Sequence, residues 1–188
     1  MGGQDKGLIE FKGREMIAWV LDALRPQVAE AVISANRNIE RYRGTGAKVV
    51  SDAGGDYAGP LAGISAGLHA CPTPYMAVAP CDGPFIPADL VSRLGQAFRT
   101  GRVEIAAAHD GERLHPTFAL IDRSVRDALD AYLAGGGRKV QEFYFMRHFA
   151  AVDFSDCPDA FLNVNTPEDM ERAGSLTGAA STAKGEKE

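Results

Sequence analysis

The sequence predicts an α/β domain in which helices cover both faces of a mostly parallel sheet. Short apolar runs rich in β-branched residues alternate with amphipathic helical segments, and this alternation is typical of such a sheet. The 188 residues are enough to bury a core, and the composition gives no sign of a second domain. We expect one domain over residues 1–173 and a disordered polar tail over residues 174–188.

The first predicted elements are one helix and two strands. Residues 15–28 repeat apolar side chains at helical spacing, although Pro26 should end this helix early. Residues 31–35 and 48–51 are short apolar runs rich in β-branched side chains, so we expect a buried strand at each.

A second helix is predicted to begin at Gly59 and Pro60. Proline at the first helical position gives up no hydrogen bond there, and Pro72 should close the helix. Residues 75–79 then predict a third strand, and residues 87–99 predict another helix because their apolar side chains fall on one side.

The last third of the domain predicts a strand pair followed by helices. Residues 103–108 and 117–121 flank a polar turn, which indicates a hairpin or a crossover at the rim of the sheet. Residues 124–133 and 140–147 predict two helices, with three consecutive glycines interrupting the chain between them. Thr166 is a suitable N-cap for a last short helix.

Charge and cysteine content exclude several function classes. The net charge of −5 provides no positive field for a nucleic acid, so we expect no such partner. Cys71, Cys81 and Cys157 are too far apart for a zinc or disulfide pattern, which favours free thiols in the cytoplasm. Proline or charge breaks every long apolar stretch, so we expect no membrane span and no signal peptide.

The chain opens with a glycine-rich segment that contains a lysine. Gly2, Gly3 and Lys6 would bring backbone N–H groups and an ammonium to a phosphate. The segment matches neither the Walker loop nor the dinucleotide fingerprint. Taken alone, it is explained more simply as a flexible start with a solvated lysine.

Two aspartates follow predicted strands. Asp52 comes after the strand at 48–51 and Asp82 after the strand at 75–79, so both should emerge at the edge where open α/β sheets bind ligands. Two carboxylates there would suit a Mg²⁺ that carries nucleotide phosphates. Each aspartate could instead cap a turn, and both explanations stay open.

Glycines and asparagines leave further alternatives. The helix N-terminus at Gly59 could face an anion or a nucleobase, whereas Gly63 and Gly67 are better explained by close packing on the sheet. The amides of Asn163 and Asn165 could bind pterin edges and phosphates, or could simply form a turn.

Basic and nucleophilic residues carry weaker signals. The histidines lack metal-ligand spacing, and no Ser-His-Asp or Cys-His arrangement has supporting sequence context. Two basic clusters could grip phosphates, although solvated surface charge explains most of their members. They are Arg37, Arg41 and Arg43, and Arg138, Lys139 and Arg147.

Seven segments stand in a fixed order along the chain. They are Met1-Gly2-Gly3-Gln4-Asp5-Lys6-Gly7, Ala35-Asn36-Arg37, Asp52, Gly59-Pro60-Leu61-Ala62-Gly63, Pro80-Cys81-Asp82, His115-Pro116-Thr117 and Asn163-Val164-Asn165-Thr166-Pro167-Glu168. In this order they resemble the motifs of the bacterial molybdenum cofactor guanylyltransferase family. The resemblance covers nearly all of residues 1–173.

The resemblance implies a Rossmann-like, nucleotidyltransferase-type fold. It also implies the transfer of GMP from GTP to the phosphate of molybdenum-molybdopterin, with Mg²⁺ as cofactor and pyrophosphate as product. By matching motif, Asp82 would bind Mg²⁺, Lys6 would contact the GTP phosphates, and both would be catalytic. Asn163 and Asn165 would bind molybdopterin. A molybdenum-insertion protein and molybdoenzyme maturation proteins are implied as further partners. The other implied nucleotide-binding residues are Gly2, Gly3, Ser34, Asp52, Gly59, Pro60 and Leu61.

Two departures from the family pattern matter. Ser34 stands where the family commonly has asparagine, so a shorter hydroxyl would replace an amide. The family also has a strand and a Leu-x-Gly-Gly…Arg segment before the residues that match Met1, and we expect this chain to lack that first strand. We therefore expect Met1 to be an internal methionine taken for the start; a chain complete as given should bind GTP poorly.

Three other functions remain as alternatives. A molybdopterin cytidylyltransferase and a sugar nucleotidyltransferase would have the same fold and related chemistry. A noncatalytic module that binds molybdopterin or a maturation partner is the alternative from another class.

Overall fold

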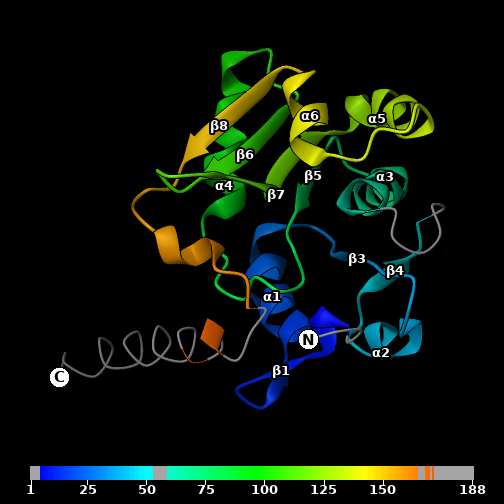
Figure 1. The fold of residues 1–188 in the computed structure, drawn as a ribbon, viewed down its shortest axis with the longest axis vertical. Helices are drawn as coiled ribbons and strands as arrows, with labels where there is room; N and C mark the ends of the chain where they lie inside the picture. Colours follow the sequence, from blue (N-terminus) through cyan, green and yellow to red (C-terminus); the bar gives the residue numbers. More distant parts are fainter. Residues whose placement is uncertain (1–4, 53–58, 165–167, 170, 172–188) are drawn as a thin grey trace.

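The computed structural model describes residues 5–52, 59–164, 168, 169 and 171, and these form a layered α/β arrangement (Figure 1). The α-helices are α1 (Met16–Leu24), α2 (Ile39–Arg43), α3 (Pro60–Ala70), α4 (Leu90–Gln96), α5 (Arg126–Ala134) and α6 (Val140–Phe145). The strands are β1 (Glu10–Phe11), β2 (Arg14–Glu15), β3 (Val32–Ser34), β4 (Lys48–Val50), β5 (Tyr75–Val78), β6 (Ile105–His109), β7 (Leu114–Asp122) and β8 (Phe149–Asp153). Short 3₁₀ turns are η1 (Lys6–Leu8), η2 (Arg25–Gln27), η3 (Ala97–Thr100), η4 (Arg123–Val125) and η5 (Pro158–Phe161).

The larger sheet has four strands in the order β5-β7-β6-β8. Strand β7 runs antiparallel to both β5 and β6, whereas β6 and β8 are parallel. The predicted hairpin around the polar turn is therefore confirmed. The expectation of a mostly parallel sheet is corrected to a mixed one, because a short turn can join only antiparallel neighbours.

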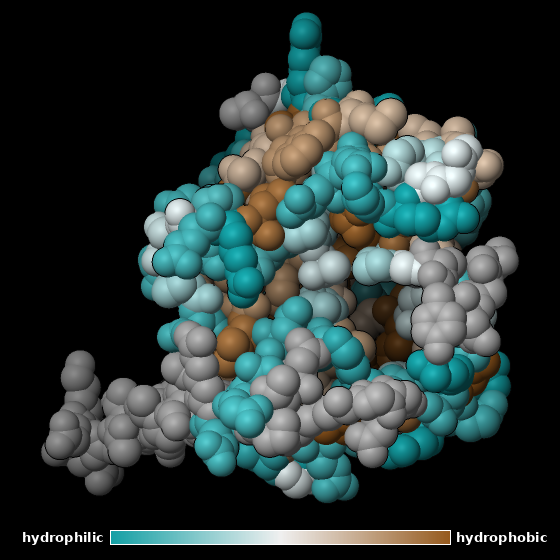
Figure 2. All heavy atoms as spheres, in the orientation of Figure 1, coloured by the Kyte–Doolittle hydropathy of each residue, from teal (hydrophilic) through white to brown (hydrophobic). Residues whose placement is uncertain are grey.

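Strands β3 and β4 pair in parallel as a separate two-stranded sheet. Within the described residues no strand pairs with both β3 and β5, so the strands that were expected in one sheet lie in two. Beside β3 and α3 the molecular surface is hollowed, and apolar atoms are visible in its depth (Figure 2).

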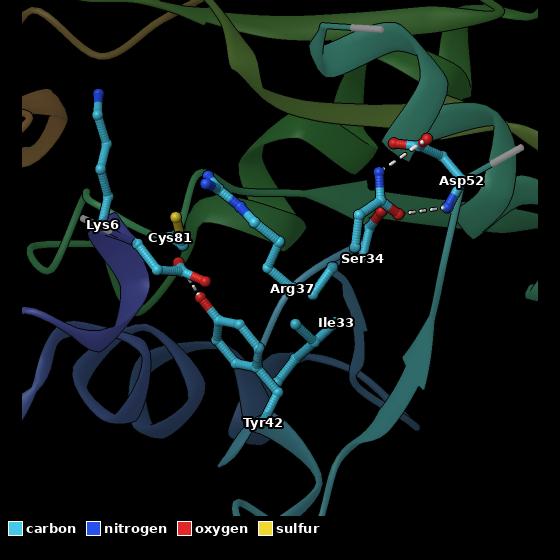
Figure 3. Close-up of a pocket in the computed structure, with 10 residues that line it drawn as sticks. Lys6, Ile33, Ser34, Arg37, Tyr42, Asp52 and Cys81 are labelled. Atoms are coloured by element: carbon cyan, nitrogen blue, oxygen red, sulfur yellow. Dashed lines mark hydrogen bonds between the residues drawn. The ribbon is translucent and has the colours of Figure 1, made fainter. Parts of the chain in front are cut away.

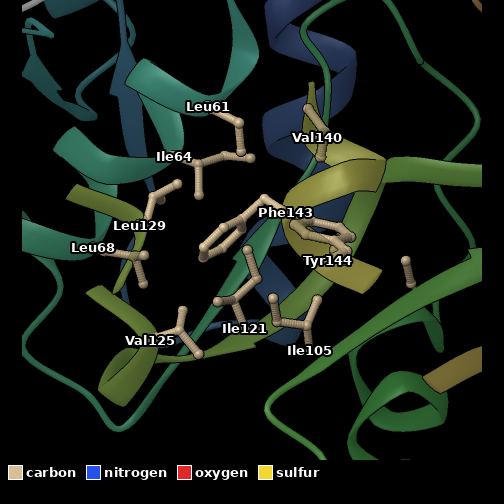
Figure 4. Packing of buried hydrophobic residues seen from close by; sticks show 12 residues of the cluster. Leu61, Ile64, Leu68, Ile105, Ile121, Val125, Leu129, Val140, Phe143 and Tyr144 are labelled. Carbon is tan, nitrogen blue, oxygen red and sulfur yellow. The ribbon is translucent and has the colours of Figure 1, made fainter. Parts of the chain in front are cut away.

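Helices cover both faces of the larger sheet, as predicted. Successive residues of a strand point to opposite faces. Ile105 and Ile121 pack with buried side chains of α3, α5 and α6 (Figure 4). Ala106 and Leu120, their neighbours in β6 and β7, pack instead with side chains of α1 and α4.

Helix α3 lies against strands of both sheets, and its glycines allow the close contact. A Cβ atom on Gly63 would lie 3.0 Å from Oγ of Ser34 in β3. A Cβ atom on Gly67 would lie 2.9 Å from Sδ of Met76 in β5. A larger residue at either position would force its neighbour to move, which agrees with the prediction that these glycines serve close packing.

Most predicted elements are present with shifted ends. Helix α1 ends at Leu24, and Pro26 lies in the 3₁₀ turn that follows. Helix α2, strand β8 and the β1–β2 hairpin were not predicted. The helix expected from Thr166 starts outside the described residues, as does the tail at 174–188. No helix in the described part of the chain combines the length and apolarity needed to cross a bilayer.

Candidate functional site

A cavity of about 400 Å³ opens at the carboxyl ends of β3 and β4 (Figure 3). Ser34, the last residue of β3, and Asp52, which follows β4, lie on one side of it. Lys6 and Cys81 lie on the other side. The cavity thus occupies the sheet edge at which parallel α/β folds bind ligands.

One end of the cavity is lined by neutral and acidic polar groups. Asn36 Nδ2 donates a hydrogen bond of 3.0 Å to Asp52 Oδ1, and the backbone N–H of Asp52 donates one of 3.1 Å to Asn36 Oδ1. This reciprocal pair holds the loop after β3 against the loop after β4. With the exposed hydroxyl of Ser34, it offers donors and acceptors to a planar polar group such as a nucleobase.

The other end carries two basic side chains, together with the carboxylate of Asp5. Lys6 lies at this end, and the side chain of Arg37 points into the cavity toward the side of Lys6 and Cys81 (Figure 3). In the described part of the chain Arg37 forms neither a hydrogen bond nor an ion pair with another residue. Two positive charges facing one cavity favour an anionic ligand, and a planar guanidinium suits a phosphate. Arg37 is exposed, as the sequence favours for most of these basic residues, and it also lines the cavity.

Asp82 lies beside this basic end. Its side chain is only 8% exposed, and its Oδ2 accepts a hydrogen bond of 3.1 Å from Lys6 Nζ. The backbone carbonyl of Asp82 accepts a hydrogen bond of 2.9 Å from the N–H of Val164. This contact brings the exposed Asn163 next to the Asp82 segment.

Asp52 and Asp82 each have a partner of their own. Asp52 bonds Asn36, and Asp82 bonds Lys6. The described residues contain no group of three or more histidines, cysteines, aspartates or glutamates arranged to hold a metal. A cation at this edge would therefore depend on ligand oxygens as well as on protein carboxylates.

The remaining sequence-predicted residues are less informative. Gly59 caps α3 at φ 75°, a conformation that favours glycine, and Pro60 follows it as the first helical residue. Leu61 is fully buried. Gly2, Gly3 and Asn165 lie outside the described residues.

Sequence reasoning missed the residues that anchor the loop of Lys6. Asp5 accepts hydrogen bonds from the hydroxyl of Tyr42 and, at 3.1 Å, from Nδ2 of Asn38. No local pattern marks these contacts, because the partners are separated by more than thirty residues. The one sign of them in the sequence is Tyr42, an aromatic residue in the otherwise charged connection between β3 and β4.

A serine, a histidine and an aspartate meet between α3 and α5. Asp130 accepts a hydrogen bond of 2.7 Å from Ser65 and lies 2.8 Å from Nε2 of His69. In a nucleophilic triad the histidine would contact the serine, whereas both residues here contact the carboxylate. The group cross-links two helices, which agrees with the sequence argument against hydrolysis.

The chain matches a known family over most of its length. Residues 1–151 match the MobA-like NTP transferase domain. A molybdenum cofactor guanylyltransferase from a Shewanella species is 45% identical over 172 residues, covering 92% of this chain and 88% of that relative. One from Shewanella pealeana is 42% identical over 174 residues, covering 93% and 87%.

Solved structures share the fold at lower identity. Molybdopterin-guanine dinucleotide biosynthesis protein A from Archaeoglobus fulgidus superposes with a TM-score of 0.77 at 21% identity, covering 94% of this chain and 92% of that one. The 2-C-methyl-D-erythritol 4-phosphate cytidylyltransferase from Thermus thermophilus gives 0.70 at 21% identity, covering 92% and 93%. These likenesses confirm the expected nucleotidyltransferase-type α/β fold.

Cys81 lines the cavity but is a poor nucleophile. Burial, and then the negative charges of Asp82 and Asp5, raise the pKa of its thiol to about 12. Only the thiolate attacks electrophiles, so the thiol is unreactive near neutral pH. Transfer through a covalent cysteine intermediate is therefore disfavoured.

We expect the alkylation rate of Cys81 in the folded protein to rise about tenfold per pH unit between about pH 8 and 10, because its thiolate fraction stays small over this range. An ordinary thiol, with a pKa of about 8.5, levels off above about pH 9. Mass spectrometry after iodoacetamide pulses measures the rate, and the denatured protein serves as the control. If folded Cys81 levels off with the control, its raised pKa is refuted.

Proposed function

Because this chain belongs to the molybdenum cofactor guanylyltransferase family of MobA-like NTP transferases, we propose that it transfers GMP from GTP to the phosphate of molybdenum-molybdopterin. The observation that carries the proposal is the cavity with the basic side chains of Lys6 and Arg37 at one end and the polar groups around Asp52 at the other. A nucleoside triphosphate is complementary to this cavity, because its anionic phosphates would face the basic end and its heterocyclic base would face the polar end.

The two ends of the cavity define how GTP would lie. Lys6 and Arg37 would hold the triphosphate through charge-assisted hydrogen bonds. Asp52, supported by Asn36, and Ser34 would face the base. A carboxylate can accept hydrogen bonds from the ring N–H and the amino group of guanine, whereas cytosine offers only the amino group. This difference favours GTP over CTP.

Asp82 fits the role of the magnesium ligand. Mg²⁺ takes one or two protein carboxylates and completes its shell with phosphate oxygens and water. Asp82 supplies a mostly buried carboxylate whose partner, Lys6, is itself a proposed phosphate ligand. When bound, Mg²⁺ would neutralise charge on the triphosphate.

The reaction needs positioning and charge neutralisation rather than a covalent nucleophile. A phosphate oxygen of molybdopterin attacks the α-phosphorus of GTP in line, the new P–O bond forms, and the bond to the β-phosphate breaks. The Lys6 ammonium offsets the charge that builds on the departing pyrophosphate.

The molybdopterin side rests on the segment that follows η5. Asn163 is exposed beside Val164, whose backbone bonds that of Asp82, so its amide would lie close to the proposed metal ligand. Asn165 would complete this side.

A molybdenum-insertion protein and maturation proteins would deliver and receive the cofactor. The described chain keeps its three cysteines as free thiols, as a cytoplasmic location would require.

The experiment that tests the function is a pyrophosphate-release assay with molybdenum-molybdopterin, Mg²⁺ and either GTP or CTP. We expect release with GTP, formation of the guanine dinucleotide, and a markedly lower rate with CTP. Preference for CTP would identify a cytidylyltransferase, and activity with sugar phosphates a sugar nucleotidyltransferase. Binding of molybdopterin without pyrophosphate release would indicate a noncatalytic module.

Replacement of Asp82 should remove transfer without unfolding the protein. We expect Asp82→Ala to lower kcat by roughly 100-fold or more, as is common when one charge-stabilising group is lost. Asp127→Ala, at an exposed position on α5, is the matched control and should keep full activity. Circular dichroism verifies the fold of both variants. Full activity of Asp82→Ala with magnesium would rule out the metal role.

Arg37 should contribute to GTP binding. We expect Arg37→Ala to raise KM for GTP about tenfold, equivalent to ~1.4 kcal/mol, with a smaller change in kcat because the contact exists before and during transfer. Arg43→Ala is the control, since Arg43 pairs with Glu40 and does not line the cavity. An unchanged KM in Arg37→Ala, measured by initial rates, would exclude this arginine from the nucleotide site.

A further inference from the structure

Tyr42 is a buried residue on a short, otherwise exposed helix. It is 3% exposed although most of α2 faces solvent. Its hydroxyl donates a hydrogen bond to Oδ1 of Asp5, in the loop that precedes η1. Burial, and then this carboxylate, raise the pKa of Tyr42, so the hydroxyl stays protonated and remains a donor.

The same hydroxyl packs against the residue on the other side of Lys6. A Cβ atom on Gly7 would lie 2.6 Å from the Tyr42 hydroxyl and 3.2 Å from Cβ of Cys81. No real Cβ could occupy this space without movement of its neighbours. Gly7 is therefore enclosed between Tyr42 and Cys81, the residue before Asp82.

Asp5 is held from two directions. Its Oδ2 accepts a hydrogen bond of 3.1 Å from Asn38, the residue that precedes α2, while its Oδ1 accepts from Tyr42. Both carboxylate oxygens are thus bound to the α2 segment. Because each contact fixes a different oxygen, the carboxylate cannot rotate without breaking one of them.

Lys6 lies between these two fixed neighbours. Its own side chain is 56% exposed, so packing does not determine where the ammonium lies. The backbone from which the side chain starts is held on both sides, because Asp5 is bonded to Tyr42 and Gly7 is packed against Tyr42. From this backbone position the ammonium reaches Asp82 at 3.1 Å.

We propose that Tyr42 is a positioning residue that fixes the loop of Lys6 by bonding Asp5 and packing on Gly7, and so aims the ammonium at the phosphates of the bound nucleotide. The inference rests on the proposed function for the identity of the ligand. The clamp itself, formed by Tyr42, Asp5 and Gly7, is a property of the fold and can be tested without any ligand.

The first test measures the clamp by amide hydrogen exchange. Leu8 and Ile9 donate backbone hydrogen bonds within the η1 turn, to Asp5 and Lys6. We expect Tyr42→Phe, which keeps the ring and removes the hydroxyl, to accelerate exchange of these two amides by roughly tenfold because the turn opens more often. Unchanged exchange would overturn the clamp, whatever the substrate is.

The matched control is Tyr144→Phe. Tyr144 is also fully buried, and its hydroxyl donates a hydrogen bond of 3.0 Å to the Pro116 carbonyl, among residues that do not line the cavity. This variant loses the same chemical group and should leave the Leu8 and Ile9 amides unchanged. Faster exchange at these amides in the control as well would show a general loss of stability and would also overturn the clamp.

The second test asks whether the clamp acts through Lys6. We expect Tyr42→Phe to raise the dissociation constant of Mg²⁺-GTP about fivefold when Lys6 is present, and less than about twofold in a Lys6→Ala background, because no ammonium remains to be positioned. Gly7→Ala, which displaces the Tyr42 hydroxyl, should show the same dependence on Lys6. An equal factor in both backgrounds would refute the positioning role. A wild-type protein that binds no GTP would contradict the proposed function. The hydrogen-exchange test would still show whether Tyr42 holds the loop of Lys6.

Discussion

The ion pair between Lys6 and Asp82 is the interaction on which the rest of the site depends. Asp82 has lost most of its contact with water, and a buried carboxylate is stable only when a cation or several donors face it. The N-terminal loop supplies that cation, so the loop and the segment after β5 stabilise each other. In the proposed complex Mg²⁺ would take the place of the Lys6 ammonium beside Asp82, and a phosphate would take the place of the Asp82 carboxylate beside Lys6. Ligand binding would then exchange one charge-balanced arrangement for another, with little uncompensated charge at any stage.

The site is assembled from segments that are far apart in the sequence. The loops after β3 and β4 supply the polar end of the cavity, the turn η1 supplies Lys6, and the segment after β5 supplies Cys81 and Asp82. None of these segments is held in place by the strands alone. Side-chain contacts complete the assembly: Asn36 with Asp52 on one side, and the tyrosine clamp on the other. The cavity therefore depends on hydrogen bonds between loops as much as on the sheet.

The sequence predicted the parts of the fold that local periodicity encodes. Helix α1 has apolar spacing that a short window reveals, strands β3, β4 and β5 are short apolar runs, and Pro60 and Pro72 mark the ends of α3. Helix α2 has only five residues, too few for a periodic signal, and the antiparallel pairing of β7 with β5 joins strands that no local pattern connects. The proposed roles of Lys6 and Asp82 come from motif resemblance, and their mutual contact is seen only in the structure. Tyr42 could not be found, since its partner Asp5 lies 37 residues away.

Helix α3 acts as a spacer between the two sheets. It contacts the side chain of Ser34 in β3 at Gly63 and that of Met76 in β5 at Gly67, where the glycines place no side chain of their own between helix and strand. The close approach of α3 to both sheets therefore depends on these two glycines. Because Ser34 lies under Gly63 and also lines the cavity, the same contact limits how far that wall can retreat. The width available to a planar ring in the cavity would therefore depend on how α3 packs on β3.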